Sequence, residues 1–451
     1  MSFLRLMGDL SRTKSTAKRG APQRRRSLRF ESLERRELLT AATAGDFATL
    51  KQLAEEGQDY EIELTADITV TESDTIAVAG NISIDGGSSG HTITLAEGVT
   101  TRTTSLFTVS DNSLTLSNLT INGIVYSGGK GAVINQTGGT TAINSGTVIL
   151  NCAAGDGGVG YISGGSLTIG SDASDDTTIA FRANTAGNAG VFYAADSGTI
   201  TVNHGTFGGD STDDGNTCTR GGGVFYLKGG ATAEVNGGTF KNNSSVDSGR
   251  GGGVFRLYEV TTASVTINDG IFDSNSTAGK GGVIFADGGT ITINGGTITN
   301  NTARSTANNG GGGVIYINKA DATVTINGGT FTGNSATGTT NSSGGGVIYA
   351  YLGNSVTIGG SATIISDNTA NRGAVLFINK NGAKTVTIND GTFSGNSAVG
   401  SGYSGGGVIC VFNNKGAATA ITINGGTFTG NSSTGGSGSQ SYSGGGVVSI
   451  H

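Results

Sequence analysis

Four aspartates in the middle of the chain are the residues whose type and spacing could support chemistry. Asp210, Asp213 and Asp214 lie within one short segment, and Asp247 occupies the loop expected one repeat later. Grouped carboxylate oxygens are ligands that Ca²⁺ takes, and a Ca²⁺-dependent lyase would also need a positioned Arg or Lys base. Solvated loop aspartates are the commoner case. The sequence therefore offers this group as its candidate Ca²⁺ site and predicts no other cofactor.

Glycoside hydrolysis needs two carboxyl groups about 5 to 9.5 Å apart. Asp269 and Asp390 occupy equivalent corners of the repeat, but four repeats separate them, which corresponds to about 19 Å of strand spacing. His204, Arg220 and Arg250 are expected to be exposed loop or corner residues, since no partner constellation accompanies them. We therefore expect a protein that is not an enzyme. The alternative is a β-helix that binds or degrades polysaccharides, as a lyase or a glycosidase.

The charge of the chain is divided unevenly. Residues 1–40 hold 11 Lys and Arg against 4 Asp and Glu, which leaves 16 against 29 in the rest of the chain. The basic part reads as a disordered leader, and the weakly acidic body offers no footprint for nucleic acid. No apolar run is long enough for a transmembrane helix. Cys152, Cys218 and Cys410 form no metal-binding pattern, so we expect small buried side chains.

The composition points to β-structure with many tight turns. The chain has 82 Gly, 1 Pro and no Trp, and triplets such as Val324-Thr325-Ile326 alternate with the period of a half-buried strand. This triplet opens a unit that continues to Asn334, passes through a loop and ends at 344–349 with Gly-Gly-Gly-Val-Ile-Tyr. The unit recurs along the chain, which indicates a repeat architecture.

Each repeat contains an apolar residue followed three positions later by Asn or Asp. The ten pairs are Val148/Asn151, Phe181/Asn184, Phe207/Asp210, Phe240/Asn243, Phe272/Asn275, Ile298/Asn301, Phe331/Asn334, Ile365/Asn368, Phe393/Asn396 and Phe428/Asn431. The segment from the corner Asn after the Val-Thr-Ile triplet, such as Asn327, to the Asn of the pair, such as Asn334, has a fixed length. The segment after the Asn of the pair varies in length. Variable length of this kind is typical of loops.

Three strands per repeat would make one coil. Val-Thr-Ile points two side chains inward, Asn-Gly-Gly turns the chain, and Thr-Phe-Thr points Phe inward. The facing of the third strand, Gly-Val-Ile-Tyr, stays open. Stacked coils should align the inward Phe set into one aromatic ladder and bond the corner Asn amides to one another. Near the third strand lie five tyrosines that would either form an exposed sugar-stacking stripe or pack inward: Tyr226, Tyr258, Tyr316, Tyr349 and Tyr351.

The sequence thus predicts an all-β, right-handed, single-stranded parallel β-helix of about ten regular three-strand rungs. Residues 124–451 hold the regular repeats, and residues 61–123 hold two or three irregular rungs. Residues 41–60 form a capping helix and linker, because Asp46 can cap a helix that Gly57 ends. The final rung, ending at 449–451, leaves backbone groups unpaired, so we expect end-to-end self-association.

The leader contains a segment with a family resemblance. Leu33-Glu34, Arg36 and Leu38-Leu39 resemble the LEPR-XLL segment near the N-terminus of exported proteins of planctomycete-type bacteria, with Arg35 where that segment usually has Pro. The resemblance implies an extracellular or cell-envelope destination.

The repeats resemble those of the chlamydial-type polymorphic outer-membrane proteins, in which FxxN and GGAI elements alternate. Gly131-Ala132-Val133-Ile134 matches the second element, and most copies have Val in place of Ala, as in Gly346-Val347-Ile348. The resemblance implies a pectin-lyase-like β-helix that is secreted and adheres to cells or surfaces. Its partners would be cell-surface glycans or envelope proteins.

Overall fold

The computed structural model describes residues 39–171, 178–258, 262–306, 309–319, 321–336, 338, 343–352, 354–379, 384–400, 403–412, 419–434 and 442–450. The basic leader and its LEPR-XLL-like segment, apart from the last residues of each, lie outside these residues. Residues 39–451 form one compact unit.

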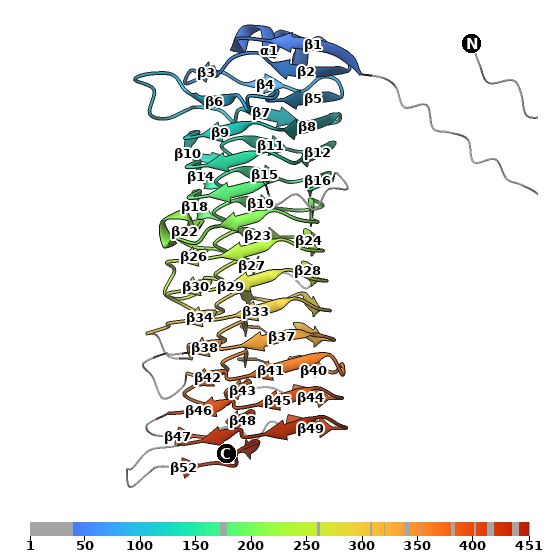
Figure 1. Ribbon diagram of the computed structural model, residues 1–451. Coiled ribbons are helices and arrows are strands. Elements are labelled where there is room, and N and C mark those ends of the chain that lie inside the picture. The colour runs from blue at the N-terminus through green and yellow to red at the C-terminus, as the bar shows by residue number, and fades with distance from the viewer. Residues whose placement is uncertain are drawn as a thin grey trace, which may run out of the picture. The chain divides into compact units, whose positions relative to one another are not determined.

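This unit is a right-handed parallel β-solenoid, so the predicted fold class is confirmed. Successive coils lie side by side along the axis (Figure 1). Three long parallel sheets run the length of the stack, and a fourth begins at Val125. We number these sheets 1 to 4 in the order in which a regular coil visits them.

Sheet 1 carries the Val-Thr-Ile triplets and has 14 described strands. They are β1 (Thr40–Ala44), β2 (Tyr60–Leu64), β5 (Ile82–Asp85), β8 (Ser113–Ser117), β12 (Thr140–Ile143), β16 (Ser166–Ile169), β20 (Thr199–Val202), β24 (Thr232–Val235), β28 (Ser264–Ile267), β32 (Thr290–Ile293), β36 (Thr323–Ile326), β40 (Ser355–Ile358), β44 (Lys384–Ile388) and β49 (Thr419–Ile423).

Sheet 2 carries the Thr-Phe-Thr triplets and has 13 described strands. They are β3 (Ile68–Val70), β6 (Thr92–Leu95), β9 (Thr120–Asn122), β13 (Val148–Leu150), β17 (Ala180–Arg182), β21 (Thr206–Gly208), β25 (Thr239–Lys241), β29 (Ile271–Asp273), β33 (Thr297–Thr299), β37 (Gly329–Thr332), β41 (Thr363–Ser366), β45 (Thr392–Ser394) and β50 (Thr427–Thr429).

Sheet 3 was not foreseen. Its 11 described strands are β10 (Val125–Lys130), β14 (Ala153–Asp156), β18 (Thr185–Asn188), β22 (Thr217–Cys218), β26 (Ser244–Ser245), β30 (Ser276–Thr277), β34 (Thr302–Ala303), β38 (Ser335–Ala336), β42 (Thr369–Ala370), β46 (Ser397–Ala398) and β51 (Ser432–Ser433). The expectation of three strands per rung is therefore wrong, because each regular coil adds this short fourth strand. Eight of its described strands have only two residues, which are too few to show a period in a sequence.

Sheet 4 carries the Gly-Val-Ile-Tyr segments and has 13 described strands. They are β4 (Ile76–Ala77), β7 (Phe107–Val109), β11 (Ile134–Gln136), β15 (Gly160–Ile162), β19 (Phe192–Ala194), β23 (Phe225–Lys228), β27 (Phe255–Tyr258), β31 (Ile284–Ala286), β35 (Ile315–Ile317), β39 (Ile348–Ala350), β43 (Leu376–Asn379), β48 (Ile409–Phe412) and β53 (Val448–Ile450). Two further strands, β47 (Tyr403–Ser404) and β52 (Tyr442–Ser443), pair with each other.

The first coil is covered by helix α1 (Phe47–Glu55). The Asp46 side chain accepts a hydrogen bond from the Thr49 amide at 2.8 Å, which caps the helix as predicted. Leu50 and Ala54 are fully buried, and the helix packs against β1, β2, β3 and β4. Because β1 also extends sheet 1, the cap consists of one strand and one helix.

The interior is filled by stacked apolar side chains. Phe181, Phe207, Phe240 and Phe272 stack in sheet 2 with ring centroids 4.6 to 4.8 Å apart. Ile298 then takes the next position in register. Later, Ile365 separates Phe331 from the stacked pair Phe393 and Phe428. The single aromatic ladder that we expected is therefore wrong, since isoleucines interrupt it twice.

Sheet 4 has two packed faces, which answers the open question of its facing. Ile348 and Ala350 belong to the main core, whereas Tyr349 between them belongs to a separate buried cluster with Phe285, Tyr316, Phe377 and Cys410. Alternation along a strand accounts for this division. The glycine-rich segment before each strand lies close to these rings, since a Cβ atom added at Gly311 would meet the Tyr349 ring at 2.8 Å.

Candidate functional site

The outer face of sheet 1 presents rows of small polar side chains. We call the outward positions of β28, β32, β36, β40, β44 and β49, with the residue that follows each strand's last isoleucine, the threonine face. Its rows are Ser264, Thr290, Thr323, Ser355, Thr385 and Ala420; then Thr266, Thr292, Thr325, Thr357, Thr387 and Thr422; then Asn268, Asn294, Asn327, Gly359, Asn389 and Asn424. The register between these strands is continuous, so the rows are straight.

The outer asparagines bond to one another along the axis. Each Nδ2 donates to the Oδ1 of the preceding coil, at 2.8 Å from Asn268 to Asn236, 2.8 Å from Asn294 to Asn268 and 2.9 Å from Asn327 to Asn294. Gly359 interrupts this outer ladder, which resumes between Asn424 and Asn389 at 2.8 Å. The predicted bonding between corner amides is present here.

A second asparagine ladder lies inside the coil, between sheets 2 and 3. It is formed by Asn184, Asn216, Asn243, Asn275, Asn301, Asn334, Asn368, Asn396 and Asn431. From Asn184 to Asn396, each Nδ2 donates to the Oδ1 of the next asparagine at 2.9 to 3.1 Å. The other Nδ2 hydrogen bonds a carbonyl of the preceding coil, as from Asn334 to Ile298 O. The apolar residue and the asparagine of the repeat therefore have different roles. The apolar residue fills the core, and the asparagine forms hydrogen bonds with the buried polar groups of the corner.

Two of the predicted pairs are out of phase with this inner ladder. Ile149 aligns with Phe181, so the first pair is Ile149 and Cys152 in place of Val148 and Asn151. Three consecutive apolar residues in β13 hide the alternation that would have set the phase. After Phe207, the ladder position is filled by Asn216, because an inserted turn carries Asp210 outward.

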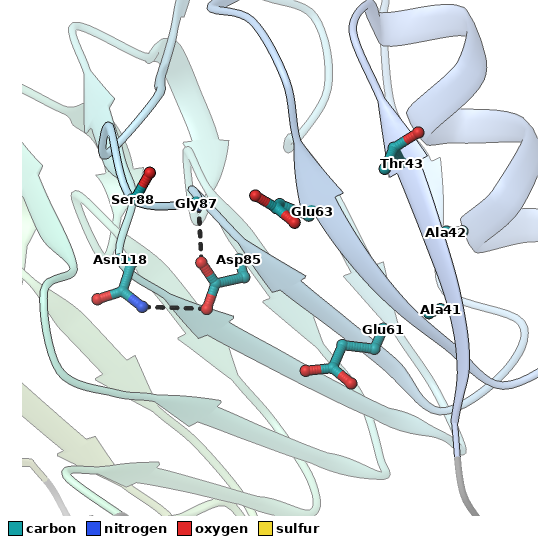
Figure 2. Close-up of a pocket in the computed structure, with 9 residues that line it drawn as sticks. All are labelled: Ala41, Ala42, Thr43, Glu61, Glu63, Asp85, Gly87, Ser88 and Asn118. Carbon is teal, nitrogen blue, oxygen red and sulfur yellow. Dashed lines mark hydrogen bonds between the residues drawn. The ribbon is translucent and has the colours of Figure 1, made fainter.

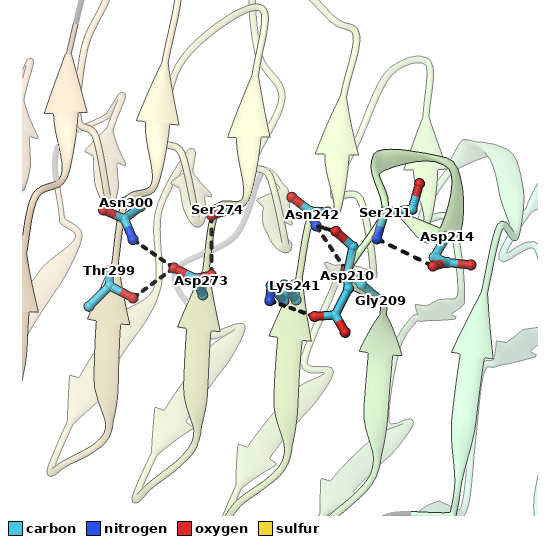
Figure 3. A network of polar contacts seen from close by, with 10 residues as sticks. All are labelled: Gly209, Asp210, Ser211, Asp214, Lys241, Asn242, Asp273, Ser274, Thr299 and Asn300. Atoms are coloured by element: carbon cyan, nitrogen blue, oxygen red, sulfur yellow. Dashed lines mark hydrogen bonds and ion pairs between the residues drawn. The ribbon is translucent and has the colours of Figure 1, made fainter.

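The aspartates of the candidate Ca²⁺ site are held by different partners. The exposed Asp210 carboxylate pairs with the Lys241 ammonium at 2.7 Å, and this hydrogen bond holds the pKa of Asp210 below its usual value (Figure 3). Asp213 and Asp214 lie in the 3₁₀ turn η1 (Thr212–Asp214). The Asp214 carboxylate caps the N-terminal end of this turn by accepting a hydrogen bond from the Ser211 amide.

Asp247 sits apart from these residues, on the loop that follows β26. Its Oδ1 accepts from the amides of Gly249 at 2.7 Å and Arg250 at 3.1 Å. Across the part of the chain that the structure describes, no group of three or more His, Cys, Asp or Glu side chains is placed to hold a metal ion. The structure therefore does not bring the four aspartates together.

The other residues singled out in the sequence are scattered. Asp269 and Asp390 follow β28 and β44, four strands apart in sheet 1, and each bonds the amide of the next residue at 2.8 Å. Arg220 and Arg250 are exposed, whereas His204 is half-buried. The three cysteines are buried and free: Cys152, Cys218 and Cys410. Burial raises the pKa of their thiols to about 12, about 11 and about 12.

The tyrosines neither join the main core nor form an exposed stripe, because they pack in separate clusters on the outer side of sheet 4. Tyr226, Tyr316 and Tyr349 are buried, and Tyr258 and Tyr351 are partly buried beside them. Two stacks lie on the outer side of sheet 4, one running through Tyr161, Tyr193, Tyr226 and Tyr258 and the other through Phe285, Tyr316, Tyr349 and Phe377. Tyr351 packs against the second stack.

A buried ion pair, missed in the sequence, joins these two stacks. Arg256 aligns between Tyr226 and Phe285, with its guanidinium carbon 4.2 Å from the Phe285 ring centroid. Its Nη2 lies 2.6 Å from Asp287 Oδ2, and both side chains are only 2% exposed. Asp287 Oδ1 also accepts from Asn318 at 2.6 Å. Only the out-of-pattern Arg in a row of aromatics could have signalled this pair.

A cavity of about 730 Å³ lies against the first coils, over the outer face of β2 and β5 (Figure 2). Glu61, Glu63 and Asp85 point their carboxylates toward it. Asp85 accepts from the Gly87 amide at 2.7 Å and from Asn118 Nδ2 at 3.0 Å. The sequence does not indicate this cavity, because its residues belong to the irregular coils, where no repeat aligns them.

Comparison with known proteins adds no family to this picture. No family model, no curated protein and no solved structure matches the chain. Among the described residues, no helix is long and apolar enough to cross a membrane.

Proposed function

We propose that this chain is a non-enzymatic repeat protein of the cell surface or extracellular space, with a structural or adhesive role. One observation carries the proposal: the polar side chains outside the core repeat in register from coil to coil, as the Thr row from Thr266 to Thr422 illustrates. Catalysis needs unlike groups that converge on one point. Extended contact along a rod needs like groups repeated at each step.

The likeness to polymorphic outer-membrane protein repeats supports this role. The FxxN element supplies the buried aromatic residue and the inner asparagine, as Phe331 and Asn334 do. The Gly-Gly-apolar element leads into sheet 4, as at Gly346-Val347-Ile348. Both elements thus have a structural task that any protein with this repeat would need, and we infer a pectin-lyase-like β-helix with surface glycans or envelope proteins as partners.

The proposed location rests on the leader. Its resemblance to the LEPR-XLL segment favours export. Its 11 Lys and Arg against 4 Asp and Glu make it basic, in contrast to the acidic repeats. The full chain, expressed in its native host with an epitope tag, should fractionate with the envelope or the medium. Deletion of residues 1–40 should retain it in the cytoplasm. A full-length chain that stays in the cytoplasm would contradict the proposed location.

The alternative function is polysaccharide degradation, and the cavity beside Glu61, Glu63 and Asp85 is the specific observation in its favour. Those carboxylates lie on neighbouring strands, as Glu63 pairs in register with Asp85. The purified chain should neither hydrolyse nor β-eliminate pectin, alginate or similar acidic glycans. Turnover abolished by Glu63→Gln would assign the activity to the cavity. Turnover abolished by Asp213→Asn or Asp214→Asn would assign it to the aspartate loop instead, and either result would overturn the non-enzymatic proposal.

A further inference from the structure

The threonine face is an unpartnered surface with a two-dimensional repeat. Neighbouring strands of a parallel sheet lie about 4.8 Å apart, and alternate residues along a strand lie about 6.6 Å apart. Because β28 to β49 pair without a register shift, both spacings recur over six coils. The outer asparagine ladder adds a third row and ties most of its neighbouring coils together.

The hydroxyl groups of this face are available to a ligand. Thr266, Thr292, Thr325, Thr357 and Thr387 are partly exposed, and their hydroxyls have no hydrogen-bond partner among the residues that the structure describes. The amides of the third row, by contrast, are occupied by one another. Each threonine therefore offers a free hydroxyl beside a methyl group at a fixed position.

The face carries no charge in its three rows. All of its positions hold Ser, Thr, Asn, Ala or Gly, and the acidic Glu234 on β24 marks its first boundary. The exposed carboxylates of Asp269 and Asp390 lie next to the third row, but the three rows themselves offer a charged ligand no counter-charge. A neutral ligand that repeats in two dimensions would find the same contact at every coil.

The size and chemistry of the face narrow the occupant further. Six strands and five residues cover roughly 400 Å², which is about half of the 800 Å² per partner that a stable protein interface buries. A second copy of the chain is thus a poor fit. Exposed aromatic rings would offer sugars a surface on which to stack, but the tyrosine stacks of this chain lie on sheet 4 and are largely buried.

We propose that the threonine face binds ice. The oxygen lattice of hexagonal ice is neutral and, like the face, repeats in two dimensions. Threonine suits such a lattice, because its hydroxyl takes a water position and its methyl group favours ordered water beside it. Each contact is weak, but a rigid lattice and a rigid sheet sum the contacts over six coils without losing further conformational entropy.

The test measures thermal hysteresis of the purified full-length chain and its incorporation into slowly growing polycrystalline ice. Thr325→Lys, in the middle of the face, should reduce both readings by about tenfold, since an ammonium group must be dehydrated against a neutral lattice. Thr325→Val keeps the methyl group and should retain most of the activity. Thr392→Lys, on exposed sheet 2, is the matched control and should change neither reading. Unchanged melting curves show that each variant is folded.

Several outcomes would overturn the inference. They are exclusion of the native chain from ice, equal losses in Thr325→Lys and Thr392→Lys, or a dimer that Thr325→Lys dissociates. Sedimentation onto insoluble cellulose or chitin that Thr325→Lys abolishes would assign the face to polysaccharide. The inference does not depend on the location of the protein, so an ice-inactive chain in the envelope would leave the proposed surface role intact.

Discussion

The inner asparagine ladder gives the sharpest test of how the stack is held together. Asn334 is fully buried, and its Nδ2 donates to Ile298 O at 2.8 Å and to Asn368 Oδ1 at 3.0 Å. Its Oδ1 accepts from the backbone amide and from Nδ2 of Asn301, both at 3.0 Å. Asn334→Ala therefore removes four hydrogen bonds at a corner that water does not reach.

The expected cost follows from the groups left behind. The Asn301 amide, one Asn301 side-chain hydrogen and the Ile298 carbonyl lose their partners in this variant. A buried polar group without a partner costs about 1–3 kcal/mol, so we expect a loss of roughly 3–6 kcal/mol after relaxation. Asn334→Asp keeps the two acceptor contacts but turns a second oxygen toward Ile298 O and Asn368 Oδ1. We expect it to be less stable at pH 7 than at pH 4, where protonation restores one donor.

The matched control lies in the outer ladder of the same coil. Asn327 is exposed, and its Nδ2 donates to Asn294 Oδ1 at 2.9 Å, so Asn327→Ala should cost less than about 1 kcal/mol. Urea unfolding compares the free energies, and hydrogen exchange at the Asn301 amide reports on the corner itself. Equal losses for the two variants, or an Asn301 amide that stays protected in Asn334→Ala, would refute the role assigned to the inner ladder.

Three further predictions concern the core, the thiols and the ends. Phe331→Asp should cost at least about 4 kcal/mol by burying a charge, whereas Thr332→Asp on the outer side should cost about 1 kcal/mol or less; equal shifts in thermal melting would reject the strand phase. Because the folded-state pKa of Cys152, Cys218 and Cys410 is raised, the unfolded state loses protons first. Stability should be complete below pH 9 and fall as pH rises toward 11 to 12, by up to about 1.4 kcal/mol per pH unit per thiol; urea unfolding between pH 7 and 11 checks this, and a triple Cys→Ala variant with the same slope would contradict it. A polypeptide ending at residue 451 should associate end to end, and an added tail with Lys and Pro should suppress the association; a strict monomer at high concentration in sedimentation velocity would count against it.

The regular part of the fold could be predicted because every stacked coil contains the same sequence pattern. The apolar residue and the asparagine of each pair, such as Phe331 and Asn334, keep a fixed spacing within the repeat, so the many copies average out local ambiguity. The assignment of the inward residue and the ladder asparagine was wrong in the two repeats that depart from the pattern. β13 is apolar at all three positions, and the insertion after Phe207 moves the inner asparagine ladder to Asn216. Sheet 3 was lost because a two-residue strand has no period.

The candidate sites were harder to predict, since they depend on contacts between coils that share no pattern. The four loop aspartates looked like a cluster in the sequence, but their carboxylates have separate partners: Asp210 pairs with Lys241 of the next coil, whereas Asp214 and Asp247 bond amides of their own loops. Arg256 and Asp287 belong to neighbouring coils, and Asp287 lies two residues after Phe285, the residue that aligns with Arg256 in sheet 4. Only the register of sheet 4 brings them into contact.

The same register explains why this chain contains so few charged residues, 13% of the total. In-register parallel coils place each side chain over its equivalent at about 4.8 Å, so a repeated Lys or Asp would repel itself at every step. Side chains that interact favourably with an identical side chain of the next coil avoid this cost. Asn amides, Thr hydroxyls and aromatic rings are side chains of this kind. Charges enter where neighbouring coils differ, as in the pairs Asp210 with Lys241 and Arg256 with Asp287. The neutral outer face is therefore a direct consequence of the stacking that stabilises the core, and any ligand of that face must be one that a neutral, repeating surface can bind.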